Sequence, residues 1–102
     1  MKPAVLAPRA RRDLIAAVRW IARDNPDAAR ALRHGVARAA ELIGQFPNIG
    51  SLREDLADSP VRFYVLRGFP YLLVDDADAS PPRILRILHG ARDLPEDLGT
   101  SP

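Results

Sequence analysis

Three short apolar runs in the C-terminal third of the chain limit its possible folds more than any other feature. They lie between residues 61 and 95, and two groups of turn-forming residues separate them, Arg67–Pro70 and Asp75–Pro82. Gly, Pro, Asp and Ser at these places favour tight reversals of the chain, so consecutive runs are expected to pair antiparallel. We therefore predict a three-stranded antiparallel meander that ends at the polar cluster of residues 89–93.

A helix is predicted near the N-terminus, after a short apolar segment at residues 2–7 that we interpret as an edge strand. Pro8 is suited to the first turn of a helix. The apolar residues that follow recur at helical spacing, and the pattern ends at Asp24-Asn25. The predicted buried face of this helix comprises Leu14, Ile15, Val18, Ile21 and Ala22.

The sequence Asn25-Pro26-Asp27 signals the start of a second helix. Asn caps helices, Pro fits the first helical position, and Asp suits the positive end of the helix dipole. The predicted buried face of this helix comprises Ala28, Ala29, Leu32, Gly35, Val36, Ala39, Ala40, Ile43 and Phe46. A connection this short folds the two helices into an antiparallel hairpin.

Together these elements predict an α+β fold. An N-terminal antiparallel two-helix hairpin packs on one face of a twisted, mostly antiparallel sheet of about four strands. A chain of 102 residues is long enough for one core and too short for a second. We predict a single domain over residues 1–98 and a frayed tail over residues 99–102.

Composition excludes several classes of site and location. The chain has no cysteine, which rules out disulfides and thiolate metal sites. It starts without an apolar signal core, and no apolar run approaches the length of a membrane span, so we predict a cytoplasmic protein with no membrane partner. Fourteen of its fifteen basic residues are arginine, but the net charge is only +2. Codon bias in a GC-rich genome explains the arginine better than an anionic partner does.

An ordered set of short motifs resembles the RelE/ParE superfamily of bacterial type II toxins. The set spans roughly residues 5–98 and comprises Ala10, Asp13-Leu14, Trp20-Ile21, Asp24-Asn25-Pro26 with Ala29, Phe46-Pro47, Gly50, Phe69-Pro70-Tyr71, Ile84-Leu85-Arg86 and residues 89–95. A helix pair followed by a small curled sheet is the order of elements in that superfamily. The last predicted strand and its sequel, RILRILHGARDLP, are similar to the ParE-like branch.

The resemblance implies a growth-inhibiting toxin that a cognate ParD-like antitoxin neutralises. In this family the antitoxin has an N-terminal DNA-binding dimerisation part and a C-terminal segment that folds along the toxin. We therefore expect a hetero-oligomer that contacts DNA only through the antitoxin. DNA gyrase is the target that the ParE-like branch implies. The RelE-like branch implies the alternative function, a ribosome-dependent mRNA endoribonuclease, and a domain that only partners the antitoxin is a third reading.

The residues themselves argue against catalysis. RNA cleavage without a metal needs a base, an acid and cations for the developing phosphorane charge. Arginines on the predicted sheet could supply the cations, but His89 is the only acid or base near its end, and a structural hydrogen bond is the commoner fate of such a histidine. Asp75, Asp76 and Asp78 lack the pattern of a calcium loop and are interpreted as a solvated hairpin tip. We predict no catalytic residue, no metal and no cofactor.

The last predicted strand is the main candidate for partner binding. Alternation places Leu85 and Ile87 on one face and Ile84, Arg86 and Leu88 on the other. The hairpin can cover only one of these faces, so the second is expected to form a groove in which Arg86 meets a partner's carboxylate. The alternative is that Arg86 pairs within the chain, with Glu54, Asp55 or Asp75.

Trp20 lies outside the apolar stripe of the first helix. Packing against the second helix is the favoured interpretation, and an exposed anchor for a partner is the alternative, because Trp and Arg are frequent hot-spot residues. The full set of predicted partner-binding residues is Trp20, Arg62, Tyr64, Arg67, Ile84, Arg86, Leu88, His89 and Arg92.

Overall fold

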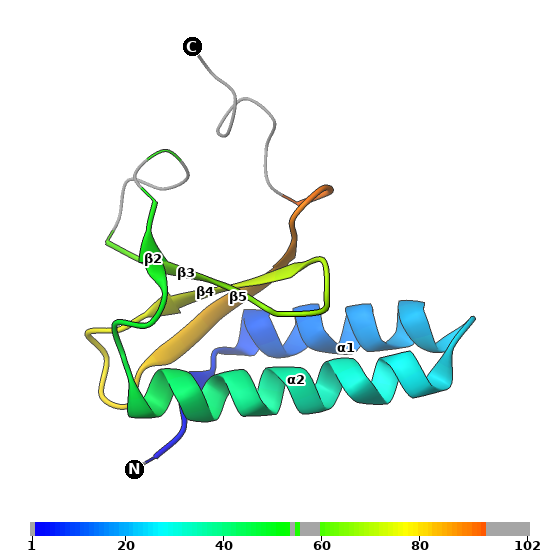
Figure 1. The fold of residues 1–102 in the computed structure, drawn as a ribbon, viewed down its shortest axis with the longest axis horizontal. Helices are drawn as coiled ribbons and strands as arrows, with labels where there is room; N and C mark the ends of the chain where they lie inside the picture. The colour runs from blue at the N-terminus through cyan, green and yellow to red at the C-terminus, as the bar shows by residue number, and fades with distance from the viewer. Residues whose placement is uncertain (1, 54, 56–59, 94–102) are drawn as a thin grey trace.

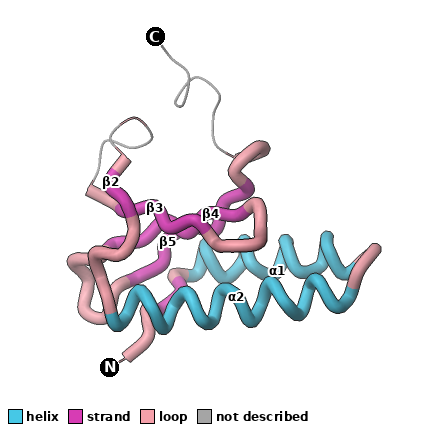
Figure 2. The backbone as a smooth tube through the Cα atoms, viewed as in Figure 1, coloured by secondary structure: helices cyan, strands magenta, loops and turns pink. Residues whose placement is uncertain are grey.

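A computed structural model describes residues 2–53, 55 and 60–93 of the chain, and the predicted tail at 99–102 lies outside the described residues. The elements in chain order are β1 (Val5–Leu6), α1 (Pro8–Ala22), α2 (Pro26–Gln45), β2 (Ser51–Leu52), β3 (Arg62–Val65), β4 (Tyr71–Asp76) and β5 (Arg83–His89). The two helices form one layer and the sheet lies against it as the other (Figure 1; Figure 2). No helix among the described residues has the length and apolar character that a membrane span requires.

The sheet contains five strands in the order β1-β5-β4-β3-β2. The pairs β2–β3, β3–β4 and β4–β5 are antiparallel, and β1 pairs parallel with β5. The predicted meander is therefore confirmed as β3–β4–β5, and the predicted N-terminal edge strand is confirmed as β1. The sheet has one strand more than the expected four, because Ser51 and Leu52 extend its far edge as β2.

The start of α2 follows its capping signal. The Oδ1 atom of Asn25 accepts a hydrogen bond of 3.0 Å from the backbone N–H of Ala28, and Pro26 occupies the first helical position. The predicted apolar residues Ala29, Leu32, Val36, Ala39, Ala40 and Ile43 are buried. Phe46 is a correction, because its side chain is 55% exposed. The helix ends at Gln45, and Phe46 has left the helical conformation with a φ of −129°.

The buried face of α1 is narrower than predicted. Ala10 and Ala17 are its buried residues, and Leu14, Val18 and Ile21 pack against the core beside them. Two residues of the predicted face are corrections, since Ile15 is 45% exposed and Ala22 is also exposed. Small residues on the inner face let α1 lie close to β5, and this close approach creates the site described below.

Gly44 determines where the N-terminal segment lies. A Cβ atom at this position would stand 2.2 Å from the carbonyl oxygen of Lys2 and 2.7 Å from the Cα of Pro3, so only glycine allows this contact. The backbone N–H of Ala4 then donates to the carbonyl of Ala40 at 2.8 Å. The segment is thereby held against α2 and delivers β1 to the edge of β5.

The main core lies between the helix hairpin and the sheet. Its fully buried members include Leu32, Val36, Ile43, Leu73 and Ile84. A smaller cluster occupies the opposite face of the sheet and comprises Phe63, Val74 and the partly buried Val61, Leu72 and Leu88. Both faces of the sheet are therefore apolar, as the doubly apolar last strand predicted.

A break in the register of β5 overturns the predicted alternation of its side chains. Val74 pairs with Arg86 while Asp75 pairs with Ile84, so Leu85 has no residue opposite it. One extra residue of this kind is a β-bulge, and it inverts the facing of everything beyond it. Ile84 and Ile87 consequently both join the main core under the helices, whereas Leu88 joins the cluster on the other face.

Candidate partner-binding site

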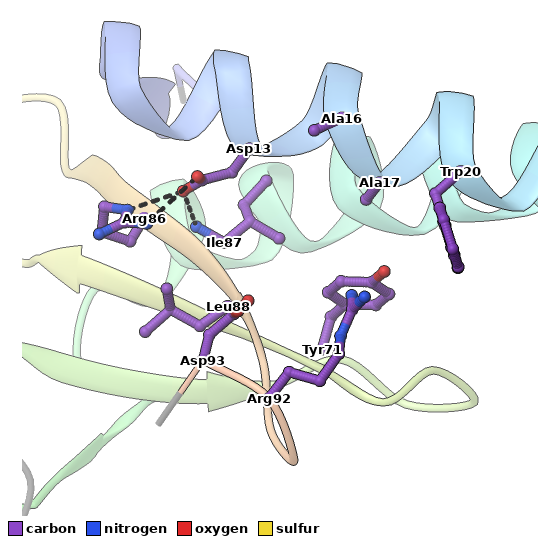
Figure 3. A pocket seen from close by; sticks show the side chains of 10 residues that line it. All are labelled: Asp13, Ala16, Ala17, Trp20, Tyr71, Arg86, Ile87, Leu88, Arg92 and Asp93. Atoms are coloured by element: carbon purple, nitrogen blue, oxygen red, sulfur yellow. Dashed lines mark hydrogen bonds and ion pairs between the residues drawn. The ribbon is translucent and has the colours of Figure 1, made fainter. Parts of the chain in front are cut away.

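A groove lies between helix α1 and the edge of β5. β4 pairs with one side of β5, and on the other side β1 pairs only with Arg83 and Ile84. Beyond Ile84 this outer side of β5 has no strand beside it among the described residues, and α1 runs along it instead. The groove has a volume of about 690 Å³ (Figure 3). Its lining residues are Asp13, Ala16, Ala17, Trp20, Tyr71, Arg86, Ile87, Leu88, Arg92 and Asp93.

Asp13 ties α1 to β5 at one end of this groove. The Nε atom of Arg86 donates to Asp13 Oδ2 at 2.8 Å and its Nη2 atom donates to Oδ1 at 3.3 Å. The backbone N–H of Ile87 donates to the same Oδ2 at 2.9 Å. The pair is partly sheltered, with 35% of the Arg86 side chain and 17% of the Asp13 side chain exposed. The hydrogen bond to Asp13 raises the pKa of the Arg86 guanidinium, so the charged form of this guanidinium is favoured.

This ion pair corrects the expectations for Arg86. Its partner is a carboxylate of its own chain, but not one of the three considered from the sequence. Asp55 pairs with Arg53 at 2.7 Å, Asp75 lies elsewhere in the sheet, and Glu54 is outside the described residues. Asp13 was missed because it lies 73 residues away in the sequence. The sequence did hold a signal for this contact. Asp13 lies one helical turn from both Ala10 and Ala17 and therefore on the packed side of the helix, where a carboxylate needs a partner.

His89 and Asp93 form a hydrogen-bonded turn at the other end of β5. The backbone N–H of His89 donates to Asp93 Oδ2 at 2.7 Å. The Nδ1 atom of His89 accepts from the N–H groups of Ala91 at 3.2 Å and Arg92 at 3.3 Å. The imidazole also meets the ring of Tyr71 edge to face at 5.3 Å between centroids. His89 therefore makes structural hydrogen bonds, as expected, and its Nδ1 atom serves as the acceptor.

Trp20 is exposed, which corrects the expectation that it packs against the second helix. Its residue surface is 59% exposed, and the guanidinium carbon of Arg23 lies 5.1 Å from its ring centroid. It projects from the side of α1 that faces the groove (Figure 3). A second hollow continues from the groove and shares Trp20, Tyr71 and Arg92 with it. This exposed position favours the alternative interpretation, in which Trp20 is an anchor for a partner.

The structure gathers only some of the predicted partner-binding residues. Trp20, Arg86, Leu88 and Arg92 line the groove, and His89 lines the adjoining hollow. Tyr64 packs against the main core, Arg67 lies in the exposed turn between β3 and β4, and Ile84 is fully buried. Ile84 is therefore removed from any contact surface, because the bulge at Leu85 turns it toward the helices.

Arg62 and the buried Asp75 lie opposite each other on the neighbouring strands β3 and β4. Arg62 donates from Nη1 to the carbonyls of Gly50 at 2.8 Å and Asn48 at 3.4 Å. Asp75 lies opposite Arg62 in the sheet, is 0% exposed, and neither of its carboxylate oxygens has a hydrogen-bond partner among the described residues. Burial raises the pKa of Asp75 to about 6, with Arg62 opposing the rise and Asp76 adding to it.

Asp75 also corrects the prediction of a solvated aspartate cluster. It belongs to β4 and is buried, whereas Asp78 is exposed and donates its backbone N–H to Asp76 Oδ1 at 3.0 Å in the turn that follows. Within the described residues, no group of three or more His, Asp or Glu side chains is placed to hold a metal ion.

Comparison with known proteins places this fold in a family. A family model described as "ParE toxin of type II toxin-antitoxin system, parDE" matches residues 4–94. A solved chain from the "Chromosomal ParDE TA system from P. aeruginosa" is similar in fold, with a TM-score of 0.71 and 22% sequence identity over 87% of this chain and 96% of that chain. No curated protein matches. Because the family model spans most of the chain, including both helices and the whole meander, the chain belongs to the ParE toxin family of type II toxin–antitoxin systems.

Proposed function

We propose that this chain inhibits bacterial growth by binding DNA gyrase, and that a cognate ParD-like antitoxin neutralises it by docking along the α1–β5 groove. The proposal places the protein in the cytoplasm, as part of a hetero-oligomer that contacts DNA only through the antitoxin. The single observation that carries the docking site is the exposed Trp20 at a groove that also presents Arg92 and Leu88. Exposed Trp and Arg beside an apolar floor are the usual composition of a binding hot spot.

The chemistry of the groove suits a segment that is both apolar and acidic. Ala16, Ala17 and Leu88 contribute apolar lining, while Arg92 and the Arg23 guanidinium over Trp20 supply positive charge at one end. A disordered segment that folds on binding is expected to bury about 1,000–3,000 Å². Carboxylates on such a segment would complement the arginines and speed association.

Binding rather than catalysis is the mode of action that the described side chains support. A general acid or base needs a titrating group within reach of substrate. The Nδ1 atom of His89 is occupied by two backbone N–H groups. The guanidinium of Arg86 is engaged by Asp13, and that of Arg62 by backbone carbonyls. We therefore propose that the chain acts without enzymatic activity.

A binding experiment tests the antitoxin part of the proposal. The full chain is titrated by calorimetry with the protein encoded beside its gene. Trp20→Ala is expected to weaken binding at least tenfold, as for a hot-spot aromatic. Phe46→Ala is the matched control, because Phe46 is also exposed, at 55%, but does not line the groove. Equal binding by the two variants would place the antitoxin elsewhere on the toxin.

A second experiment tests the target. Purified gyrase is assayed for DNA supercoiling with and without the full chain, and mRNA ends are mapped by primer extension after the chain is induced in cells. The proposal expects loss of supercoiling activity and an unchanged pattern of mRNA ends. Discrete new mRNA ends with intact supercoiling would contradict the gyrase proposal and favour the endoribonuclease function. Expression that does not harm the cells would indicate a domain that only partners the antitoxin.

A further inference from the structure

Tyr71 places a hydroxyl group in the α1–β5 groove, although its ring belongs to the core. The residue begins β4, is 4% exposed, and its ring meets the His89 imidazole edge to face at 5.3 Å between centroids. Among the described residues the Tyr71 hydroxyl has no hydrogen-bond partner, and the only wholly enclosed side-chain oxygens without a partner there are the two of Asp75. The hydroxyl is therefore open to the groove that Tyr71 lines, and it points toward α1 (Figure 3).

Arg92 brings a guanidinium to the same groove. The turn after β5 fixes its backbone, because its N–H donates to the His89 carbonyl at 3.2 Å. From this turn the side chain of Arg92 reaches toward α1 (Figure 3). Tyr71 and Arg92 both line the groove and also the hollow that continues from it. Two hydrogen-bond donors of different kinds are thus present in one continuous space.

The other charged side chains that line the groove are engaged by its own residues. Asp13 accepts from the Nε atom of Arg86 at 2.8 Å, and Asp93 Oδ2 accepts from the backbone N–H of His89 at 2.7 Å. No ion pair among the described residues includes Arg92. The Arg92 guanidinium is therefore the charge of the groove that is available to a bound partner.

We propose that Tyr71 and Arg92 form a receptor for one carboxylate of the segment that docks in the groove. A carboxylate accepts hydrogen bonds at two oxygens, so it can take the Tyr71 O–H while the Arg92 guanidinium neutralises its charge. The occupant is a glutamate or aspartate side chain within the segment rather than the end of the segment, because the groove continues into a second hollow and lets a chain pass. This inference rests on the proposed docking of an antitoxin in the groove.

Trp20 adds a requirement to the sequence of the docked segment. Its exposed ring lines the same groove and the same hollow as Tyr71 and Arg92. The segment must therefore carry an apolar side chain for the ring close to the carboxylate for the receptor. A lysine in place of the carboxylate would face the like charge of Arg92, so the receptor discriminates by repulsion as well as by attraction.

Two variants of the full chain test the receptor by titration calorimetry with the protein encoded beside its gene. Tyr71→Phe removes the hydroxyl and keeps the ring, and it should weaken binding about tenfold, as for the loss of a hydrogen bond to a charged group. Arg92→Ala should weaken binding about tenfold or more and make it less sensitive to salt. Tyr64→Phe and Arg67→Ala are the matched controls, because neither residue lines the groove or the adjoining hollow, and both should bind like the unchanged chain.

A scan of the partner identifies the carboxylate. Each glutamate and aspartate of the partner is changed in turn to its amide. One of these changes should weaken binding to the unchanged chain but have little further effect on binding to Tyr71→Phe, because both changes remove the same bond. The same partner residue should also couple to Arg92→Ala and not to either control.

The outcomes separate the receptor from the docking proposal. If Tyr71→Phe and Arg92→Ala bind like their controls while Trp20→Ala binds weakly, the receptor is wrong and docking in the groove stands. If all three variants bind like the unchanged chain, both proposals are wrong. Tyr71→Phe should unfold at the same temperature as the unchanged chain, because the hydroxyl makes no bond within the described fold, and Arg92→Ala repeats the test at an exposed position.

Discussion

Asp13 and Asp75 are two sheltered carboxylates of the same domain with opposite surroundings. Asp13 is 17% exposed in its side chain and accepts three hydrogen bonds, two from Arg86 and one from Ile87. Asp75 is 0% exposed, and its oxygens have no hydrogen-bond partner among the described residues. The difference teaches that burial alone does not decide whether a charge strengthens a fold. The partners it finds decide, because desolvation must be offset by bonds to the charged form.

Removing the Asp13 carboxylate should have the largest effect on stability. Asp13→Ala breaks the bonds between α1 and β5 and leaves Arg86 without its partner, so the free energy of unfolding should fall by about 2–3 kcal/mol. Urea denaturation measures the change. Asp24→Ala, at an exposed position just after the same helix, is the control and should change stability by less than about 0.5 kcal/mol. A small effect for Asp13→Ala would show that the hydrogen bonds of Asp13 add little to the free energy of unfolding, and the contrast with Asp75 would then fail.

The ionised form of Asp75 should lower the stability of the fold, whereas the Asp13 carboxylate raises it. Below the ordinary pKa of 3.8 both the folded and unfolded chains carry the proton on this residue, and between 3.8 and about 6 the unfolded chain ionises first. Stability from this group is thus present at low pH and lost as the pH rises toward about 6, by at most about 3 kcal/mol.

Asp75→Asn removes the charge that this pH dependence needs. The variant should be more stable than the unchanged chain by about 1–2 kcal/mol at neutral pH, since an amide costs less to bury than a carboxylate. Its stability should also change less between pH 4 and 6 than that of the unchanged chain. Urea denaturation at a series of pH values checks both outcomes. A destabilised variant with an unaltered pH profile would mean that Asp75 is paired in solution.

Changing Arg86 to lysine tests how much the forked contact of the guanidinium with Asp13 contributes to stability. Lysine keeps the positive charge but cannot make the forked contact with both oxygens of Asp13. We expect a loss of about 1 kcal/mol, smaller than for Asp13→Ala because the Ile87 amide keeps its acceptor. A double-mutant cycle with Asp13→Asn would show the coupling of the two side chains. No coupling would mean that the forked geometry contributes nothing.

Trp20 should matter least for stability. The residue is 59% exposed and the Arg23 guanidinium lies over its ring, so Trp20→Ala should change the free energy of unfolding by about 0.5 kcal/mol or less. Thermal unfolding measures this, with Tyr71→Ala, a change at a buried aromatic of the same groove, as the destabilising reference. A large loss for Trp20→Ala would mean that the tryptophan supports the fold rather than a partner.

Most of the fold was open to prediction because its signals are local. The cap at Asn25, the helix start at Pro8 and the turn residues around Gly68 each act on their immediate neighbours, and each led to the element expected. The candidate site was less predictable. Trp20, Arg86, Leu88 and Arg92 were identified, but Asp13 was missed and Ile84 was placed on the wrong face. Both errors concern contacts between elements far apart in the chain.

The amino-acid sequence by itself determined the order of helices and strands, the apolar character of β5 on both sides and the family likeness, because periodicity and turn chemistry operate within a few residues. Only the tertiary structure decided which side chains meet. The bulge at Leu85 changed the facing of β5, and the approach of α1 brought Asp13 to Arg86 across 73 residues. A one-residue change of register and a packing contact leave no periodic trace, so neither can be derived from local pattern.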